Sequence, residues 1–112
     1  EEVLFKIRMK IENFKVCKSF LSKARGLMFS RRENLLFVFN DEKRRSLHNW
    51  FVFFSIDLLF LDKDFRVVEI KRNFRPFDFY KSREKARYVL ELVEDHDLKI
   101  DDVVLENLHQ NI

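Results

Sequence analysis

A long apolar stretch, residues 47–70, most constrains how this chain can fold. Aromatic and β-branched residues dominate its two arms, residues 47–62 and 67–70, and the break between them contains Asp62 and Asp64. This pattern predicts two adjacent strands joined by a tight turn. The first arm is too apolar for a half-exposed strand, so we expect it to run through the centre of the core.

The size and composition of the chain predict a single domain, residues 1–112. With 46% hydrophobic and 37% charged side chains, the 112 residues can bury one core beneath a solvated surface. We expect residues 1–106 to form the folded core and the polar tail, residues 107–112, to fray. Because 14 residues are Phe, aromatic rings should fill much of the interior.

Glycine, cysteine and histidine usage excludes several kinds of site. Gly26 is the one glycine, so the glycine-rich loops that hold phosphates or dinucleotides are absent. Cys17 is the one cysteine, which rules out an internal disulfide and a thiolate metal cluster. The acidic run at residues 94–97 lacks the order of a calcium loop, and we interpret it as a solvated turn. We therefore expect no metal and no cofactor.

The segments before the central stretch are expected to alternate between strand, helix and turn. Alternating apolar residues predict a half-buried strand over residues 3–11, and helical spacing over residues 17–25 predicts a short helix that ends at Gly26. We interpret residues 35–39 as an apolar strand and the charged residues 40–45 as a turn.

The segments after the central stretch are less clear. Pro76 lies in an aromatic-rich loop, where it prevents strand pairing except at an edge. Residues 81–93 fit both a helix with an apolar stripe and a strand whose polar side includes Arg87 and Glu91, and periodicity alone does not decide. A turn at residues 101–102 and a short strand over residues 103–105 are expected to close the fold.

The charge and hydropathy of the chain bound its partners. A net charge of +3 from 22 basic and 19 acidic residues gives no strong steering field. The longest apolar run, residues 50–61, is interrupted by Ser55 and Asp57 and is shorter than the roughly 20 residues that cross a bilayer. We expect no membrane span. A cytoplasmic location is favoured, with an extracytoplasmic one left open in case a leader preceded Glu1.

Several separated blocks of the sequence resemble a known family. They are Gly26-Leu27-Met28, Leu36-Phe37-Val38-Phe39, the run from His48 through residues 55–62, and Tyr88-Val89-Leu90-Glu91-Leu92. In order and spacing they resemble the domain of unknown function 192 family, a group of uncharacterised prokaryotic proteins. The resemblance implies a mainly β (α+β) fold, a compact antiparallel barrel-like sheet with one or two short helices. It also implies that residues 88–92 form a strand.

The resemblance implies no activity, substrate or cofactor. The chain departs from the family pattern at Ser55, where the family usually has proline, and at Asp95 and Asp101, where it usually has glycine. Roles that depend on those glycines, such as close approach of a ligand to the backbone, are therefore not carried over to this chain.

Asp57 is the strongest candidate for site chemistry. A carboxylate in so apolar a strand needs a partner or must take up a proton, and Arg31, Arg45 and His48 are the candidate partners. The simpler interpretation is a structural ion pair or a carboxylate that accepts backbone N–H bonds. The sharper one is a ligand-binding pocket formed by Asp57, His48, Trp50 and Arg31, in which Asp57 binds a ligand or transfers a proton.

Residues 71–81 interleave basic and aromatic side chains, as single-stranded nucleic acid-binding proteins do. In such proteins cations follow the phosphates while rings stack on the bases. The simpler interpretation is a loop whose rings cap the open end of the barrel. The candidate contact residues are Lys71, Arg72, Arg75, Phe77, Phe79 and Tyr80.

The sequence does not establish a function, but it supports three hypotheses. We expect a small non-catalytic β domain that binds an unknown small ligand or protein partner at the barrel mouth and aromatic loop. The first alternative is nucleic acid binding through residues 71–81, and the second is an enzyme centred on Asp57 and His48. A pocket lined by those two residues favours a ligand or an enzyme, whereas a basic face with exposed Phe77 or Phe79 favours nucleic acid.

Overall fold

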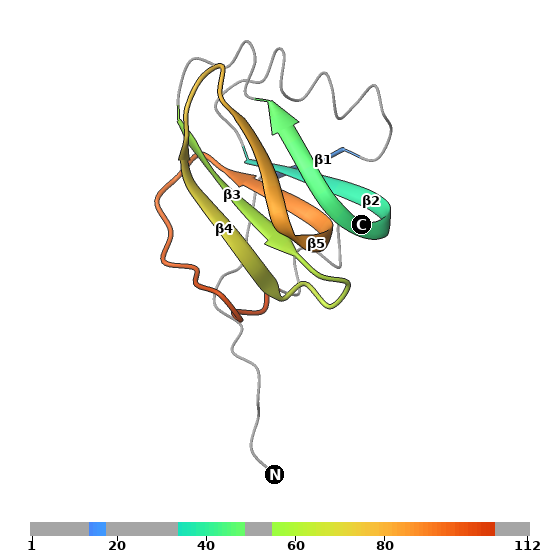
Figure 1. The fold of residues 1–112 in the computed structure, drawn as a ribbon. Helices are drawn as coiled ribbons and strands as arrows, with labels where there is room; N and C mark the ends of the chain where they lie inside the picture. Colours follow the sequence, from blue (N-terminus) through green and yellow to red (C-terminus); the bar gives the residue numbers. More distant parts are fainter. Residues whose placement is uncertain (1–13, 18–33, 49–54, 105–112) are drawn as a thin grey trace.

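The computed structural model describes residues 14–17, 34–48 and 55–104, which form one five-stranded sheet (Figure 1). The sheet order is β1-β2-β5-β3-β4; β1 runs parallel to β2, and all other pairs are antiparallel. No helix occurs in these residues, and the predicted mainly antiparallel β fold is confirmed. The strands are β1 (Phe14–Cys17), β2 (Asn34–His48), β3 (Ile56–Leu61), β4 (Val67–Phe74) and β5 (Phe79–Leu92).

Several predicted elements cannot be compared with the structure. The strand over residues 3–11, the helix that ends at Gly26 and the frayed tail at residues 107–112 lie outside the described residues. Strand β1 is not predicted by the sequence: no element is assigned to residues 14–16, and Cys17, which is expected to begin that helix, is the last residue of β1.

The central hairpin predicted from the apolar stretch is β3 and β4. Strand β3 lies between β5 and β4 and is almost wholly buried. The Asp62 carboxylate stabilises the turn by accepting bonds from the backbone N–H groups of Asp64 at 2.8 Å and Arg66 at 3.0 Å. The first arm is shorter than predicted, because Leu47 and His48 belong to β2.

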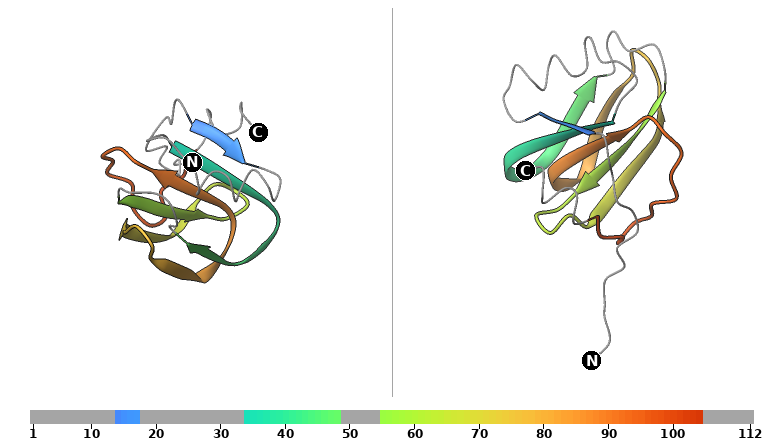
Figure 2. Two further views of the ribbon diagram at one scale, coloured as in Figure 1. Left: turned by 90° about the horizontal axis from the view of Figure 1, so that it is seen from above. Right: turned by 180° about the vertical axis from the view of Figure 1, so that it is seen from behind.

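The predicted turn at residues 40–45 is wrong. These residues continue β2, which pairs with β5 on both sides of an irregularity between Val38 and Lys43. The Arg87 side chain donates from Nε to the Phe39 carbonyl at 2.6 Å across this irregularity. A bulge that admits extra residues bends the strand without ending it, and β2 and β5 curve together as a result (Figure 2).

Residues 81–93 are resolved in favour of the strand, since β5 covers residues 79–92. Strand β5 is central and carries apolar side chains on both faces near its end. On one face Leu90 and Leu92 pack with Leu36, Leu59, Leu98 and Val104, and on the other Val89 and Ala86 pack with Leu35, Phe37, Leu58, Phe60 and Phe74. Two apolar clusters therefore lie on the two sides of one curved sheet.

The sheet curves like a barrel but does not close into one in the described residues, where β1 and β4 are its edges. A side chain bridges part of the gap between β4 and β5. The Glu69 carboxylate accepts bonds from the backbone N–H groups of Arg83 and Glu84, each at 2.8 Å, and from the Tyr80 hydroxyl. Glu69 therefore takes the place of a strand ladder at this point.

The segment after β5, near residues 101–104, covers one end of β4. Arg66 and Val103 form an isolated bridge, and Asp102 and Val67 are joined by a backbone bond of 2.8 Å. The predicted turn at residues 101–102 is present, and Asp101 has a φ of 75°, a left-handed conformation that Asp tolerates. The short strand predicted to follow it is reduced to the bridge at Val103.

Candidate functional site

Asp57 lies on β3 opposite an irregularity in β4. Its neighbours Ile56 and Leu58 pair with Phe74 and Lys71, so two residues of β4 stand opposite one of β3. The second of them, Asn73, has a φ of 53° and donates its backbone N–H to Asp57 Oδ1 at 3.0 Å. The carboxylate thus satisfies an N–H group that the bulge removes from the ladder.

The closest side-chain partner of Asp57 is His96. His96 Nε2 lies 2.7 Å from Asp57 Oδ2, and His96 Nδ1 accepts the backbone N–H of Leu98 at 3.1 Å. Because Nδ1 is an acceptor, the proton is on Nε2, which donates to the carboxylate. The His96 side chain is 1% exposed, so both ring nitrogens are held by protein groups.

Arg72 completes the network at the surface. Its guanidinium lies 3.5 Å from Asp57 Oδ2 through Nη1 and 3.3 Å from the Leu98 carbonyl through Nη2, and its side chain is 54% exposed. A pocket of about 340 Å³ opens beside it, where β3 begins and β4 and β5 end. Ser55, Asn73, Glu94 and Asp95 also line this pocket.

The structure brings together a different set of residues from those predicted around Asp57. Arg45 is not its partner: it pairs with Asp41 at 2.9 Å and donates to the Ala86 carbonyl. The backbone of His48 pairs with Phe79 at the end of β2, but its side chain is not described, and Trp50 and Arg31 lie outside the described residues.

His96 was missed because it sits in the acidic run at residues 94–97, which was interpreted as a solvated turn. Glu94, Asp95 and Asp97 are exposed as expected, whereas His96 is buried against Asp57. The signal that was available is the need of Asp57 for a donor. That need does not identify which of the distant donors meets it.

The basic and aromatic residues at 71–81 do not form one surface. Arg72 belongs to the Asp57 network, whereas Lys71 and Tyr80 lie on the opposite face of the sheet, with Lys71 Nζ 5.7 Å from the Tyr80 ring. Tyr80 also packs on Phe60 and donates to Glu69, and burial raises the pKa of Tyr80 to about 12.

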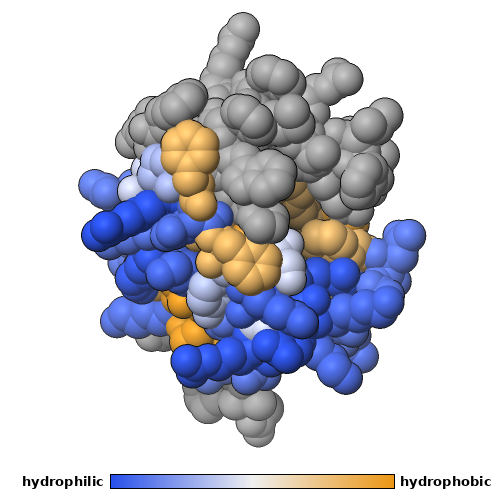
Figure 3. All heavy atoms as spheres, turned by 45° about the horizontal axis from the view of Figure 1, so that its top comes forward, coloured by the Kyte–Doolittle hydropathy of each residue, from blue (hydrophilic) through white to orange (hydrophobic). Residues whose placement is uncertain are grey.

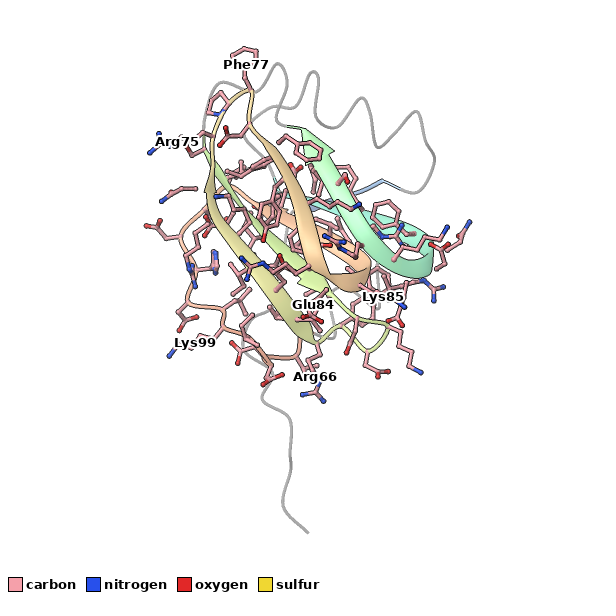
Figure 4. The ribbon with its side chains drawn as sticks, in the orientation of Figure 1. Arg66, Arg75, Phe77, Glu84, Lys85 and Lys99 are labelled. Carbon is pink, nitrogen blue, oxygen red and sulfur yellow. The ribbon has the colours of Figure 1, made fainter. Side chains whose placement is uncertain are left out.

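The other candidate contact residues, Arg75, Phe77 and Phe79, are exposed. Phe77 and Phe79 are 64% and 55% exposed, and Arg75 and Phe77 point outward at the turn between β4 and β5 (Figure 4). Lys81 continues this face along β5, where it is opposite Ser46 of β2, and Lys85 is opposite Arg44. We define the basic–aromatic face as Arg44, Arg75, Phe77, Phe79, Lys81 and Lys85.

Apolar and hydrophilic side chains alternate over this end of the molecule. Apolar groups lie among hydrophilic ones there (Figure 3). Among the described residues, no carboxylate forms an ion pair with any of the four cations of the basic–aromatic face. The face is therefore a positively charged surface with exposed rings at one end.

Glu91 is a second residue whose position was not predicted. The alternation of β5 indicated that its side chain faces the polar side, but Glu91 is 3% exposed and stands opposite Leu35 and Leu58, both in the apolar core. Its Oε2 atom has no hydrogen-bond partner in the structure that is described. Burial raises the pKa of the Glu91 carboxyl to about 8.

The described residues contain neither a candidate metal site nor a candidate membrane-spanning helix. Over residues 14–17, 34–48 and 55–104, no three His, Cys, Asp or Glu side chains are grouped so that they could hold a metal ion. That same portion of the chain has no helix with the length and apolar character needed to cross a membrane.

Comparison with known sequences places relatives of this chain in archaea. The model of the uncharacterised family DUF192 matches residues 3–104. A UPF0127 protein of Pyrococcus horikoshii is 39% identical over 80 residues, which cover 69% of each chain. One of Thermococcus sibiricus is 38% identical over 81 residues, which cover 69% of this chain and 52% of that protein, so the match spans about half of the longer relative.

Two crystal structures share the fold. One is of a "putative transcription regulator" from Sinorhizobium meliloti, with a TM-score of 0.65 and 27% identity over 70% of this chain and 66% of that one. The other is of a protein of unknown function from Novosphingobium aromaticivorans, with a TM-score of 0.63 and 24% identity over 70% and 61% of the two chains.

Proposed function

The chain belongs to the DUF192 family of uncharacterised proteins, and we propose that it is a non-catalytic binding domain that contacts an anionic partner through the basic–aromatic face. The observation that carries the proposal is the exposure of two phenylalanine rings, 64% for Phe77 and 55% for Phe79, beside cations that form no ion pair with the carboxylates of the described residues. Exposed large apolar groups among charged ones are typical of interaction surfaces.

The charges of this face support an anionic partner. Arg44 of β2 and Lys85 of β5 stand directly opposite each other, an arrangement of like charges that destabilises a pair of strands. Two carboxylates near Arg44 on β2 are engaged elsewhere: Asp41 binds Arg45 and Lys43, and Glu42 accepts the backbone N–H of Lys63. An anionic partner would offset this repulsion.

The geometry around Asp57 supports the non-catalytic part of the proposal. General acid–base catalysis needs a group that can exchange a proton with a substrate. His96 uses both ring nitrogens within the protein, and each oxygen of Asp57 accepts a bond from a protein group. This network is arranged to hold β3, β4 and the segment after β5 together.

Retention on immobilised heparin tests the proposed partner class. We expect Lys81→Glu combined with Lys85→Glu to elute at markedly lower salt than the parent protein, because two of the cations that face the polyanion are reversed. The matched control reverses Lys63 and Lys99, which are exposed at other places on the molecule. Equal shifts for the two double variants would show that only net charge matters and would overturn the proposal.

A second candidate function is the binding of a small polar ligand in the pocket beside Asp57. The observation that favours it is Arg72, which lines the pocket and whose half-exposed guanidinium has long contacts of 3.3 Å with the Leu98 carbonyl and 3.5 Å with Asp57. Arg31, His48 and Trp50, predicted to share this site, stay predictions.

A thermal-shift screen of small carboxylates, phosphates and amines tests this candidate. A ligand that binds the folded state raises its melting temperature, by an amount equivalent to about 2.7 kcal/mol at a hundredfold excess over Kd. We expect Arg72→Gln to abolish the shift and to leave the unliganded melting temperature nearly unchanged, since the residue is exposed. A hit whose shift survives Arg72→Gln would place the ligand elsewhere.

A further inference from the structure

We propose that the anionic partner of the basic–aromatic face is a single-stranded nucleic acid, with bases stacked on Phe77 and Phe79 and phosphates bound by the cations that follow along β5. The inference rests on the proposed function and adds the chemistry of the partner to it. Cations that follow a backbone, together with rings that stack on bases, are the combination by which proteins bind single strands.

The rings distinguish nucleic acid from a purely acidic partner. An acidic protein segment needs cations but gains little from exposed phenylalanine rings such as those of Phe77 and Phe79. Phe77 in addition has a φ of 67°, a conformation unfavourable for a bulky side chain, so the fold keeps an exposed ring at a strained position. An exposed ring in this conformation offers a surface on which a base can stack.

The order of the groups along β5 fits an extended strand of nucleic acid. Phe79 and Lys81 are two residues apart and lie on one side of the strand, and Lys85 follows beyond the bulge at Ser82. From Phe79 to Lys85 the face spans about 13 Å, because the opposing residues His48 and Arg44 are four residues apart on β2 and a strand rises roughly 3.3 Å per residue. Arg75 and Phe77 extend the face beyond Phe79, so it suits a short run of nucleotides.

Strand β2 supplies a further cation beside the row formed by Phe79, Lys81 and Lys85. Arg44 lies opposite Lys85, and its Nε donates to the Ser82 carbonyl at 2.7 Å, which holds the side chain across β5 rather than away from it. Arg75 flanks the rings at the other end (Figure 4). A duplex would meet the same charges, but its base faces are covered by stacking and cannot reach the rings.

Fluorescence anisotropy with a labelled 12-nucleotide oligo(dT) tests the inference on the full chain. We expect binding that weakens on the order of tenfold between 50 and 200 mM salt, as about three phosphate contacts predict. The duplex of the same length should bind more weakly. Phe79→Ala and Phe77→Ala should each weaken oligo(dT) binding by about tenfold without changing the salt dependence, because stacking is not ionic.

The cation variants have a different signature. Lys85→Gln should lower the slope of log affinity against log salt by about 0.7, the contribution of one phosphate on a single strand. Lys99→Gln, at the opposite end of the molecule from Phe77 (Figure 4), removes the same charge and should leave that slope unchanged. Urea unfolding of each variant checks that the fold is retained.

Three results would overturn the inference. Equal affinity for duplex and single strand, with no effect of the Phe variants, would show that the face binds polyanions through charge alone. Binding to heparin or to phosphatidylserine vesicles but not to oligo(dT) would refute nucleic acid while leaving an anionic partner in place. Failure to bind any of these polyanions would refute the proposed function as well.

Discussion

Asp57→Asn is expected to lower the free energy of unfolding by about 2–3 kcal/mol, the effect of leaving buried hydrogen-bonding groups without partners. The amide is nearly isosteric with the carboxylate and can still accept the backbone N–H of Asn73 through its oxygen. Its NH₂ group, however, would face the Nε2–H of His96, which places two donors against each other.

The imidazole cannot relieve this conflict by changing tautomer. Moving the proton to Nδ1 would direct it at the backbone N–H of Leu98, which now donates to that nitrogen. In either tautomer, one ring N–H of His96 therefore faces another donor, and the His96 side chain is only 1% exposed. The substitution therefore tests whether the carboxylate is required by the structure itself.

Urea unfolding monitored by Trp fluorescence and by circular dichroism measures the effect. Arg72→Gln is the matched control, and we expect it to change stability by less than about 1 kcal/mol, because its ion pair with Asp57 is solvent-exposed. Asp57→Ala and His96→Ala should be strongly non-additive in a double-mutant cycle. If Asp57→Asn unfolds at the same urea concentration as the parent, the structural role assigned to Asp57 is wrong.

The sequence predicts the parts of the fold that depend on local pattern. The β3–β4 hairpin follows from two apolar runs and an Asp-containing turn, and both strands and the Asp62 turn occur in the structure. The burial of β3 follows from the absence of alternation. Where a segment is apolar throughout or contains a turn motif, the local sequence is enough to predict its structure.

The sequence does not distinguish a charged bulge from a charged turn. Residues 40–45 have the composition of a loop, yet β5 pairs with both flanks of this segment and draws it into β2. The side chains of Arg45 and Arg87 complete the bend by bonding to carbonyls of Ala86 and Phe39, more than 40 residues away. Contacts of that kind depend on the fold and cannot be found in a local window.

The candidate site was predictable in its centre and not in its surroundings. Asp57 stands out as a lone carboxylate in an apolar strand, and it is indeed held by a network of bonds. Its partner His96 is 39 residues away, in a run whose other members are solvated. The apolar pattern around Asp57 indicates a buried carboxylate, which needs a hydrogen-bond donor. Only the fold shows which distant residue is that donor.

For Glu91, alternation along the strand predicts an exposed side chain, but the structure buries it. A polar residue between Leu90 and Leu92 indicates a strand with one solvated face. Strand β5 is the middle strand of the sheet and has an apolar cluster on each side, so the alternating position is buried too. The burial of this carboxyl has a measurable consequence for the dependence of stability on pH.

The stability of the protein is expected to fall as pH rises from about 5 to about 9, and Glu91→Gln should remove most of this dependence. Burial raises the Glu91 pKa from 4.5 to about 8, so between these values the folded state binds a proton that the unfolded state has released. Stability that depends on this group is therefore full below pH 4.5 and is lost as pH rises through 8.

The size of the effect follows from the shift, since each pKa unit corresponds to about 1.4 kcal/mol. The difference between pH 5 and pH 9 should be about 4 kcal/mol in the parent protein, because part of the change lies below pH 5. Glu91→Leu, which matches the surrounding Leu35 and Leu58, should be more stable than the parent at pH 9.

Urea unfolding of the parent, Glu91→Gln and Glu91→Leu at pH 5, 7 and 9 measures these differences. Glu84→Gln is the matched control, because Glu84 is exposed on the same strand and its removal should leave the pH profile parallel to that of the parent. The pKa of Tyr80, raised to about 12, lies above this window and does not contribute to it. Parallel profiles for the parent and Glu91→Gln would mean that the Glu91 carboxyl is hydrated or paired in solution, and its assignment as a neutral acid within the core would then be wrong.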